Sequence, residues 1–166
     1  MRRDRERPYT RRVPRQKKHT QVHAFVEPMA ALVVDNLPEG PEWLYELKFD
    51  GYRALLIKHE EMVRLHSRKD KDLTALYPGI AKAGERLDAD ILVLDGEIVA
   101  LAEDGRPSFQ ALQHRGSHAP HTIVYYAFDV LQLEGRDLTT EVLTKRRAWL
   151  PKVVAKLGDL RYGRRA

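Results

Sequence analysis

The sequence predicts an α+β fold built on a largely antiparallel sheet with packed helices. Predicted strands and helices alternate irregularly, without the repeated βαβ units that a parallel sheet requires. Several predicted strands are joined by short turns, such as Glu134-Gly135-Arg136, which favour antiparallel neighbours. The sequence contains no internal repeat and neither of the common glycine-rich phosphate loops. A nucleotide bound by this chain would therefore not be held by a P-loop.

The chain is predicted to enter this fold through an extended segment. Apolar residues return near Val22 after a polar N-terminus, and Pro28, Pro38 and Pro41 follow closely. Proline fixes φ and cannot donate a backbone hydrogen bond, so this spacing favours a turn-rich entry over a helix.

Strands and a hairpin turn are predicted next. Residues 43–49 (WLYELKF) and 52–59 (YRALLIKH) are apolar or alternating runs, and Asp50-Gly51 separates them. Asp-Gly favours a two-residue hairpin because both positions tolerate positive φ. After a charged turn, residues 62–67 (MVRLHS) predict a third strand.

The following elements alternate between helix and strand. Apolar spacing predicts a helix over 73–87, and Ser108 is a candidate N-cap for a short helix over 108–115. Residues 91–101 and 122–133 are rich in β-branched and aromatic side chains, which is typical of strands.

The C-terminal part is predicted to contain a helix over 141–150, which Pro151 interrupts or ends, and then a basic tail over 161–166. The predicted organisation is therefore a basic arm over 1–21, one folded unit over 22–160, and this tail.

Composition places the chain among soluble globular proteins. Hydrophobic residues make up 43% and charged residues 32%. No run approaches the roughly 20 apolar residues that span a bilayer, so no membrane partner is expected. The basic N-terminus lacks the apolar stretch of a secretory signal. The chain has no cysteine, which excludes disulfides and thiolate metal sites and fits the reducing cytoplasm, the compartment we expect.

The basic excess is concentrated in the N-terminal arm. Residues 1–20 hold nine Lys or Arg against two acidic residues, a net +7, so the rest of the chain carries −2 of the total +5. Such a segment buries too little apolar surface to fold alone, and we expect it to be disordered. Two interpretations stay open: contact with nucleic-acid phosphates, or no function, as a solvated tail or the result of a misassigned start codon.

The segment around Lys48 carries a pattern with chemical potential. On a strand, Glu46, Lys48 and Asp50 would share one face, while Leu47 and Phe49 would point to the other. Taken alone, this alternation is also typical of an exposed salt-bridged face.

Three further segments set polar or charged residues inside or beside apolar strands: Ser67-Arg68, Asp95-Gly96-Glu97 and Phe128-Asp129. Glu97 interrupts a run that would otherwise be buried β structure. A carboxylate in such a place needs a partner, a metal or a ligand hydroxyl.

Together these segments resemble the ordered motifs of the covalent nucleotidyltransferases, which comprise ATP-dependent DNA ligases, RNA ligases and mRNA-capping guanylyltransferases. Glu46-x-Lys48-x-Asp50-Gly51-x-Arg53 is similar to motif I. The later motifs follow in order, as His66-Ser67-Arg68 with Leu73-Thr74 (motif Ia), Asp95-Gly96-Glu97 (motif III) and Tyr126-Ala127-Phe128-Asp129 (motif IIIa).

The surrounding sequence is similar to the bacterial ligases of end-joining repair. This likeness lies in Pro28-Met29-Ala30, in Trp43-Leu44-Tyr45 and in residues 104–115 (DGRPSFQALQHR). The resemblance spans about 22–150 and implies part of an ATP-grasp-like nucleotidyltransferase domain, the adenylation domain of an ATP-dependent DNA ligase.

The resemblance also implies a reaction and its cofactors. Lys48 would attack the α-phosphate of ATP, form a phosphoramidate with AMP and expel pyrophosphate. Mg²⁺ would neutralise the triphosphate. The AMP would then pass to a 5′-phosphate in nicked or broken DNA, and a 3′-hydroxyl would displace it and seal the strand.

Each remaining motif residue has an implied role. By resemblance, Glu46 lies beside the adenine, while Arg53 and Arg68 hold the ribose and phosphates. Glu97 bonds the ribose hydroxyls or assists the metal. The Phe128 ring stacks on the base, although an aromatic residue in a strand is also an ordinary core residue.

The sequence departs from the family after the predicted helix at 141–150. There the family continues with motif IV, motif V and an OB-fold domain, and none of these is found in this sequence. Glu134-Gly135 has the letters of motif IV but is typical of a turn, and Lys152 and Lys156 have helical spacing. We therefore expect a C-terminally truncated domain that is marginally stable or associates with a second chain or domain supplying the missing motifs.

Two alternative functions stay open at the level of sequence. The chain could be a non-catalytic ligase fragment that binds nucleic acid, because motif residues can persist without activity. It could also be an RNA ligase or capping-type nucleotidyltransferase, which motif I alone does not exclude.

Overall fold

The computed structural model describes residues 25–113, 122–154 and 160–162. The predicted arm over 1–21 lies outside these residues, and so does most of the predicted tail. Six strands form one sheet: β1 (Tyr52–His59), β2 (Met62–Ser67), β3 (Ile91–Leu101), β4 (Thr122–Leu133), β5 (Arg136–Asp137) and β6 (Leu160–Tyr162). The helical elements are η1 (Thr74–Leu76), α1 (Pro78–Glu85), α2 (Phe109–Gln113), α3 (Leu143–Arg147) and α4 (Leu150–Val153).

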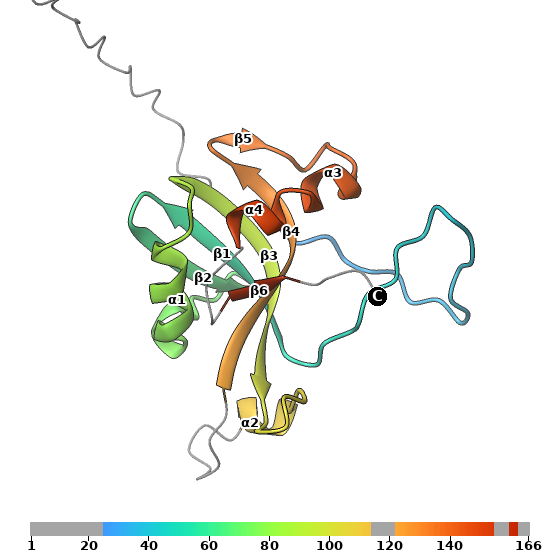
Figure 1. The fold of residues 1–166 in the computed structure, drawn as a ribbon, viewed down its shortest axis with the longest axis horizontal. Coiled ribbons are helices and arrows are strands. Elements are labelled where there is room, and N and C mark those ends of the chain that lie inside the picture. The colour runs from blue at the N-terminus through green and yellow to red at the C-terminus, as the bar shows by residue number, and fades with distance from the viewer. Residues whose placement is uncertain (1–24, 114–121, 155–159, 163–166) are drawn as a thin grey trace, which may run out of the picture.

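The predicted α+β class with a largely antiparallel sheet is confirmed. The strand order is β2-β1-β3-β4-β5, and every pair along this path is antiparallel. The short strand β6 pairs with β4 in parallel, beyond the stretch that β5 occupies. Strand β3 lies between β1 and β4 and pairs with both, so residues of these three long strands lie side by side in the middle of the sheet (Figure 1).

Four of the predicted strands are confirmed at their predicted ends, namely β1, β2, β3 and β4. The helix predicted over 73–87 is present as the short η1 followed by α1, because Pro78 starts a new helix at its first position. The Ser108 cap is confirmed, since its Oγ accepts a hydrogen bond from the amide of Ala111 at 3.4 Å.

The strand predicted over 43–49 is wrong. These residues form no regular secondary structure and belong to a long segment that projects from the sheet (Figure 1). The hairpin prediction at Asp50-Gly51 is wrong as well, because neither residue has positive φ. Gly51 is needed for a different reason: a Cβ there would lie 2.2 Å from the carbonyl oxygen of Ile98.

The C-terminal elements also differ from the prediction. The helix predicted over 141–150 is two short helices, α3 and α4, and Pro151 lies in the first turn of α4 instead of ending a helix. Strand β6 crosses the boundary predicted at residue 160, so Arg161 belongs to the sheet and not to a tail.

The main core lies on one face of the sheet, under α1 and α4. It includes Leu56, Leu94, Ile98 and Tyr125, all fully buried. On the opposite face are two smaller apolar clusters, one around Leu55 and the other around Val99. This second face carries the polar residues that the sequence singled out.

Candidate functional site

A strip of charged side chains runs across the second face, between its two apolar clusters. In the sheet register Arg53 on β1 lies opposite Glu97 on β3, and Asp95 on β3 lies opposite Asp129 on β4. Because side chains alternate along a strand, these four residues share one face. Motifs I, III and IIIa of the sequence thus meet at the centre of the sheet.

Two buried ion pairs hold this strip. Arg53 donates to both carboxylate oxygens of Asp95, at 3.1 and 2.7 Å. Arg146 of α3 donates in the same forked way to Asp129, with its shortest contact at 2.6 Å. Burial raises the pKa of Asp95, while its hydrogen bond to Arg53 opposes the rise. Such paired geometry fixes the direction in which each guanidinium points.

Glu97 is half-buried beside these pairs. Its burial raises its pKa to about 7, while the backbone amide of Gly51 and the charge of Arg53 act in the opposite direction. The partner that the sequence required for this carboxylate is thus in part the motif I glycine itself. A group with such a pKa in a cavity wall is a candidate for a functional role.

Phe128 owes its position to an irregularity in β4. The pairing with β3 skips Phe128, because Asp95 pairs with Asp129 while Gly96 pairs with Ala127. Such a bulge adds one residue to one strand and redirects its side chain, as is common next to active sites. The Phe128 ring therefore lies on the polar face, where the Arg53 guanidinium stands 5.6 Å from its centre.

A cavity of about 610 Å³ opens beside Arg53 and Glu97. Its cationic side comes from the loop that follows β2, where Arg68, Lys69 and Lys71 are exposed. The Ser67 Oγ braces this loop by accepting hydrogen bonds from the amides of Lys69 and Lys71, at 3.3 and 3.0 Å.

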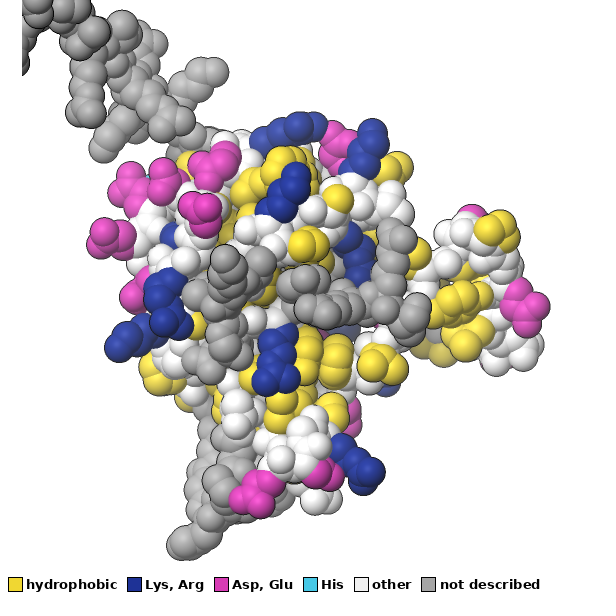
Figure 2. Space-filling model, viewed as in Figure 1, with side chains coloured by type: hydrophobic (Ala, Val, Ile, Leu, Met, Phe, Trp, Pro, Cys, Tyr) yellow, Lys and Arg dark blue, Asp and Glu magenta, His cyan; other side chains and the backbone are white. Residues whose placement is uncertain are grey.

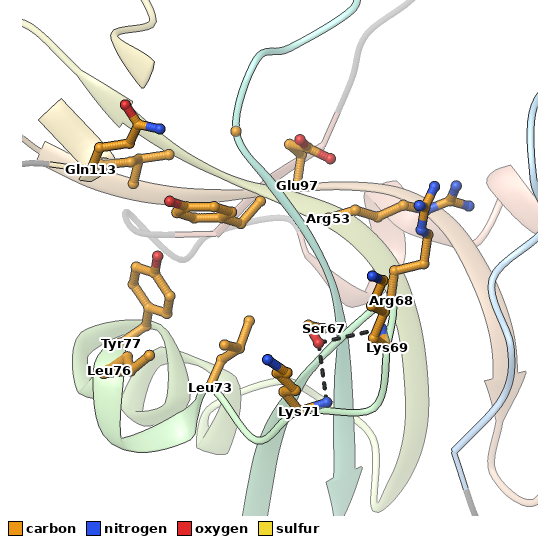
Figure 3. Close-up of a pocket in the computed structure, with 13 residues that line it drawn as sticks. Arg53, Ser67, Arg68, Lys69, Lys71, Leu73, Leu76, Tyr77, Glu97 and Gln113 are labelled. Atoms are coloured by element: carbon orange, nitrogen blue, oxygen red, sulfur yellow. Dashed lines mark hydrogen bonds between the residues drawn. The ribbon is translucent and has the colours of Figure 1, made fainter. Parts of the chain in front are cut away.

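The opposite side of the same cavity is apolar. Leu76 and Tyr77 lie there, away from the cationic loop, Leu73 lies between them and Lys71, and Gln113 is near the upper rim (Figure 3). Within the described residues, the loop cations form no salt bridge. A volume of this size with charges at one end and apolar side chains at the other can take a nucleotide.

A second cavity, of about 410 Å³, lies on the other side of Arg53. Glu46, Phe128, Asp129 and Arg147 are among its lining residues. Arg53 lines both cavities, so its guanidinium stands between a site that contains the Phe128 ring and a site that contains the cationic loop.

The structure brings some of the predicted site residues together but not all. Arg53, Arg68 and Glu97 line the larger cavity, while Glu46 and Phe128 line the smaller one with Arg53. Lys48 is exposed and lines neither cavity. Glu46, two residues before it, forms an ion pair with Arg147 of α3.

Sequence reasoning missed the partners of these residues. Asp95 and Asp129 were noted only as charged residues inside apolar strands, and Arg146 and Arg147 were assigned to an ordinary helix. The available signal was the need of each buried carboxylate for a cation, but the sequence does not say which of many arginines supplies it.

In the described part of the chain, no group of three or more His, Cys, Asp or Glu side chains could hold a metal ion. No described helix is both long and apolar enough to cross a membrane.

Comparisons with solved structures define the class of this fold. The ligase domain of LigD from M. tuberculosis superposes with a TM-score of 0.62 and 38% identity, over 72% of this chain and 38% of that chain. A mycobacterial DNA ligase D complexed with ATP and MES superposes with a TM-score of 0.61 and 36% identity, over 73% of this chain and 39% of that chain. The fold is that of a ligase nucleotidyltransferase domain.

Sequence comparison gives the family. The family described as ATP dependent DNA ligase domain matches residues 11–162. The multifunctional non-homologous end joining protein LigD of Pseudomonas aeruginosa is 41% identical over 132 residues, which cover 79% of this chain and 16% of that protein. The SPbeta prophage-derived DNA ligase-like protein LigB of Bacillus subtilis is 34% identical over 131 residues, covering 76% and 46%. The chain belongs to the ATP-dependent DNA ligase domain family, and it spans less than half the length of these relatives.

Proposed function

We propose that this chain is part of the adenylation domain of an ATP-dependent DNA ligase, with Lys48 as the residue that takes AMP. The observation that carries the proposal is the meeting of motifs I, III and IIIa on one sheet face, where Arg53 stands between two cavities. In this proposal the folded unit is residues 22–160, preceded by a basic arm over 1–21.

The proposed roles follow from the chemistry of the cavities. The adenine stacks on Phe128, beside Glu46, because a phenyl face suits a flat purine. Arg53 and Arg68 hold the ribose and phosphates, since guanidinium groups donate to phosphate oxygens in pairs. Glu97 accepts from the ribose hydroxyls. Lys48 attacks the α-phosphate from the exposed segment that contains Glu46.

Mg²⁺ is the proposed metal. It is usually held by one or two carboxylates together with substrate phosphates and water, so a dedicated cluster of protein ligands is not required. Glu97 suits this arrangement because its carboxyl group lines the larger cavity beside the proposed phosphate positions. When bound, the ion would neutralise charge on the triphosphate.

The proposed reaction has two further steps on DNA. The AMP phosphorus leaves the Lys48 nitrogen for an oxygen of a 5′-phosphate at a nick or break, and the lysine recovers its amine. A neighbouring 3′-hydroxyl then attacks the DNA phosphate and releases AMP. Relatives named for end joining support broken DNA as the substrate and repair as the process. The lack of cysteine fits a cytoplasmic location.

The decisive experiment is self-adenylation. The purified chain is incubated with α-labelled ATP and Mg²⁺, denatured and examined for bound label. We expect label that acid releases and base does not, because a phosphoramidate is acid-labile. Lys48→Ala should lose it entirely, while Lys82→Ala, which alters an exposed lysine of α1, should keep it. No label under any condition would support the non-catalytic fragment, and label from GTP would support a capping-type enzyme.

A further inference from the structure

Helix α3 carries two consecutive arginines that contact different parts of the site. Arg146 binds Asp129 on β4, and Arg147 binds Glu46 in the segment that leads to Lys48. Both arginine side chains are almost covered, at 11% and 13% exposure, whereas the neighbouring Lys145 is 75% exposed. The two arginines therefore serve the interior of the site, and Lys145 faces solvent.

Arg146 fixes α3 to the sheet. Its guanidinium donates to both oxygens of Asp129 and also to the backbone oxygen of Glu141, at 2.6 Å. Asp129 follows Phe128 directly, so this contact attaches α3 to the bulge that presents the aromatic ring. Removal of Arg146 would leave the buried Asp129 carboxylate without its cation, so loss of this contact is costly.

Arg147 extends from this anchored helix to the opposite wall of the smaller cavity. Its partner Glu46 belongs to a segment without regular secondary structure, so side-chain contacts must position that segment. On the other side of Lys48, the Phe49 ring stacks on Tyr126 of β4 with centres 4.2 Å apart. Lys48 thus lies between two contacts, an ion pair to α3 and an aromatic stack on β4.

We propose that Arg147 is a positioning residue for the proposed nucleophile, with Arg146 as its anchor. The pair of arginines holds the Lys48 segment at a fixed place relative to Phe128, so that the lysine amine closes on a nucleotide bound against that ring. The catalytic part of this inference rests on the proposed adenylation reaction. The mechanical part, that Arg147 restrains the segment, is independent of that reaction.

The mechanical part is tested by trypsin cleavage after Lys48, followed by mass spectrometry on the full chain without nucleotide. Arg147→Gln removes the charge that holds Glu46, so cleavage at Lys48 should accelerate roughly fivefold, because proteolysis follows the population of the open segment. Lys145→Gln removes a charge from the same helix and should leave the rate unchanged. Arg147→Lys, which keeps the charge, should restore part of the protection.

The catalytic part is tested by the rate of self-adenylation as a function of ATP concentration. Misplacement of a reacting group lowers the rate at saturating substrate, so Arg147→Gln should reduce that rate by roughly ten- to a hundredfold. The half-saturating ATP concentration should change less, because Arg53, Arg68 and Phe128 are intact. A general loss of fold would instead shift the urea midpoint, which we expect Arg147→Gln to preserve and Arg146→Gln to lower.

The outcomes separate this inference from the proposed function. Equal cleavage at Lys48 in Arg147→Gln and Lys145→Gln would overturn it. So would faster cleavage combined with an unchanged adenylation rate, because Arg147 would then restrain the segment without positioning the nucleophile. If the unmodified chain takes no AMP but Arg147→Gln accelerates trypsin cleavage after Lys48, the restraint by Arg147 stands and the adenylation proposal fails.

Discussion

Glu97 shows how one carboxyl group responds to its place in the sheet. Burial raises its pKa to about 7, above the ordinary value of 4.5. The folded protein therefore binds this proton more tightly than the unfolded chain does. Between these two pKa values the folded state holds more protons, so stability falls as the pH rises through the window. The loss is complete above pH 7, where the carboxylate is charged in both states.

Replacement of Glu97 by Gln should remove this dependence. We expect Glu97→Gln to be more stable than the unmodified chain at pH 8, by on the order of 1 kcal/mol once solvent screening of a half-exposed group is allowed for. At pH 4.5 the difference between the two should shrink. Urea unfolding at both pH values measures it, and a stability difference that does not vary with pH would contradict the raised pKa.

A site residue can be recognised from the sequence when its type does not fit its neighbours in the chain. Glu97 was recognisable because a carboxylate inside an apolar run demands a partner. Arg146 was not, since Lys145-Arg146-Arg147 has the composition of a solvated helix face. Its role arises only because α3 lies against β4, seventeen positions away from Asp129 in sequence. Pairing across elements is set by topology, which the residue types do not encode locally.

The same limit applies to whole elements. Strands β1, β3 and β4 could be predicted because their long runs of apolar, β-branched and aromatic side chains pack well in a sheet and poorly in other structures. Residues 43–49 have a similar composition, yet Leu47 is 77% exposed and no strand pairs with them in the described structure. A strand needs a hydrogen-bonding neighbour, and a local pattern does not supply one. Strand β6 was missed because three residues carry no detectable alternation.

Lys58 connects strand β1 to the C-terminal end of helix α1. Its ammonium group is buried and donates to the backbone oxygens of Glu85 and Leu87, at 2.8 and 2.6 Å. Lys58 lies on β1, and these oxygens lie at and just beyond the C-terminal end of α1. The side chain thus satisfies the last carbonyl group of the helix and is a second donor to the Leu87 oxygen, which also accepts from the amide of Ala89.

Lys58→Met should lower the free energy of unfolding by roughly 1–3 kcal/mol, because the Glu85 oxygen loses the Lys58 donor and the Leu87 oxygen loses one of two, while the side chain keeps a similar length. Lys82→Met, on the exposed side of the same helix, should change it by less than about 0.5 kcal/mol. Urea unfolding monitored by circular dichroism compares the two. Equal midpoints would show that Lys58 does not cap α1.

At the scale of the molecule, the two faces of the sheet are covered unequally. Helices α1 and α4 pack on one face over the main core, while the other face carries two small apolar clusters and the polar strip. Part of the segment before β1 packs on this second face, through Phe25, Val26 and Phe49, while another part projects away from the sheet (Figure 1). Large apolar side chains of this segment are exposed: Met29, Leu32, Val33, Val34, Leu37, Trp43, Leu44, Tyr45 and Leu47.

Hydrophobic side chains are visible on the lobe at the right of the space-filling view, where part of this segment projects (Figure 2). Exposed apolar side chains of this kind favour association when a protein is alone in solution. The expectation of marginal stability or association, first drawn from the sequence, therefore divides into two. We expect the packed core to stabilise the sheet and the exposed apolar side chains of the projecting segment to promote self-association.

Substitutions at the most exposed positions separate these two properties. Leu32 and Val33 are 90% and 99% exposed, so the double variant Leu32→Ser, Val33→Ser should change the free energy of unfolding by less than about 0.5 kcal/mol. Its sedimentation coefficient should depend less on protein concentration than that of the unmodified chain. Glu39→Ser alters an exposed polar residue of the same segment and should not reduce association. If the double variant unfolds at lower urea concentration, the segment packs on the sheet in solution, and its apolar side chains belong to the core of the domain instead of to an association surface.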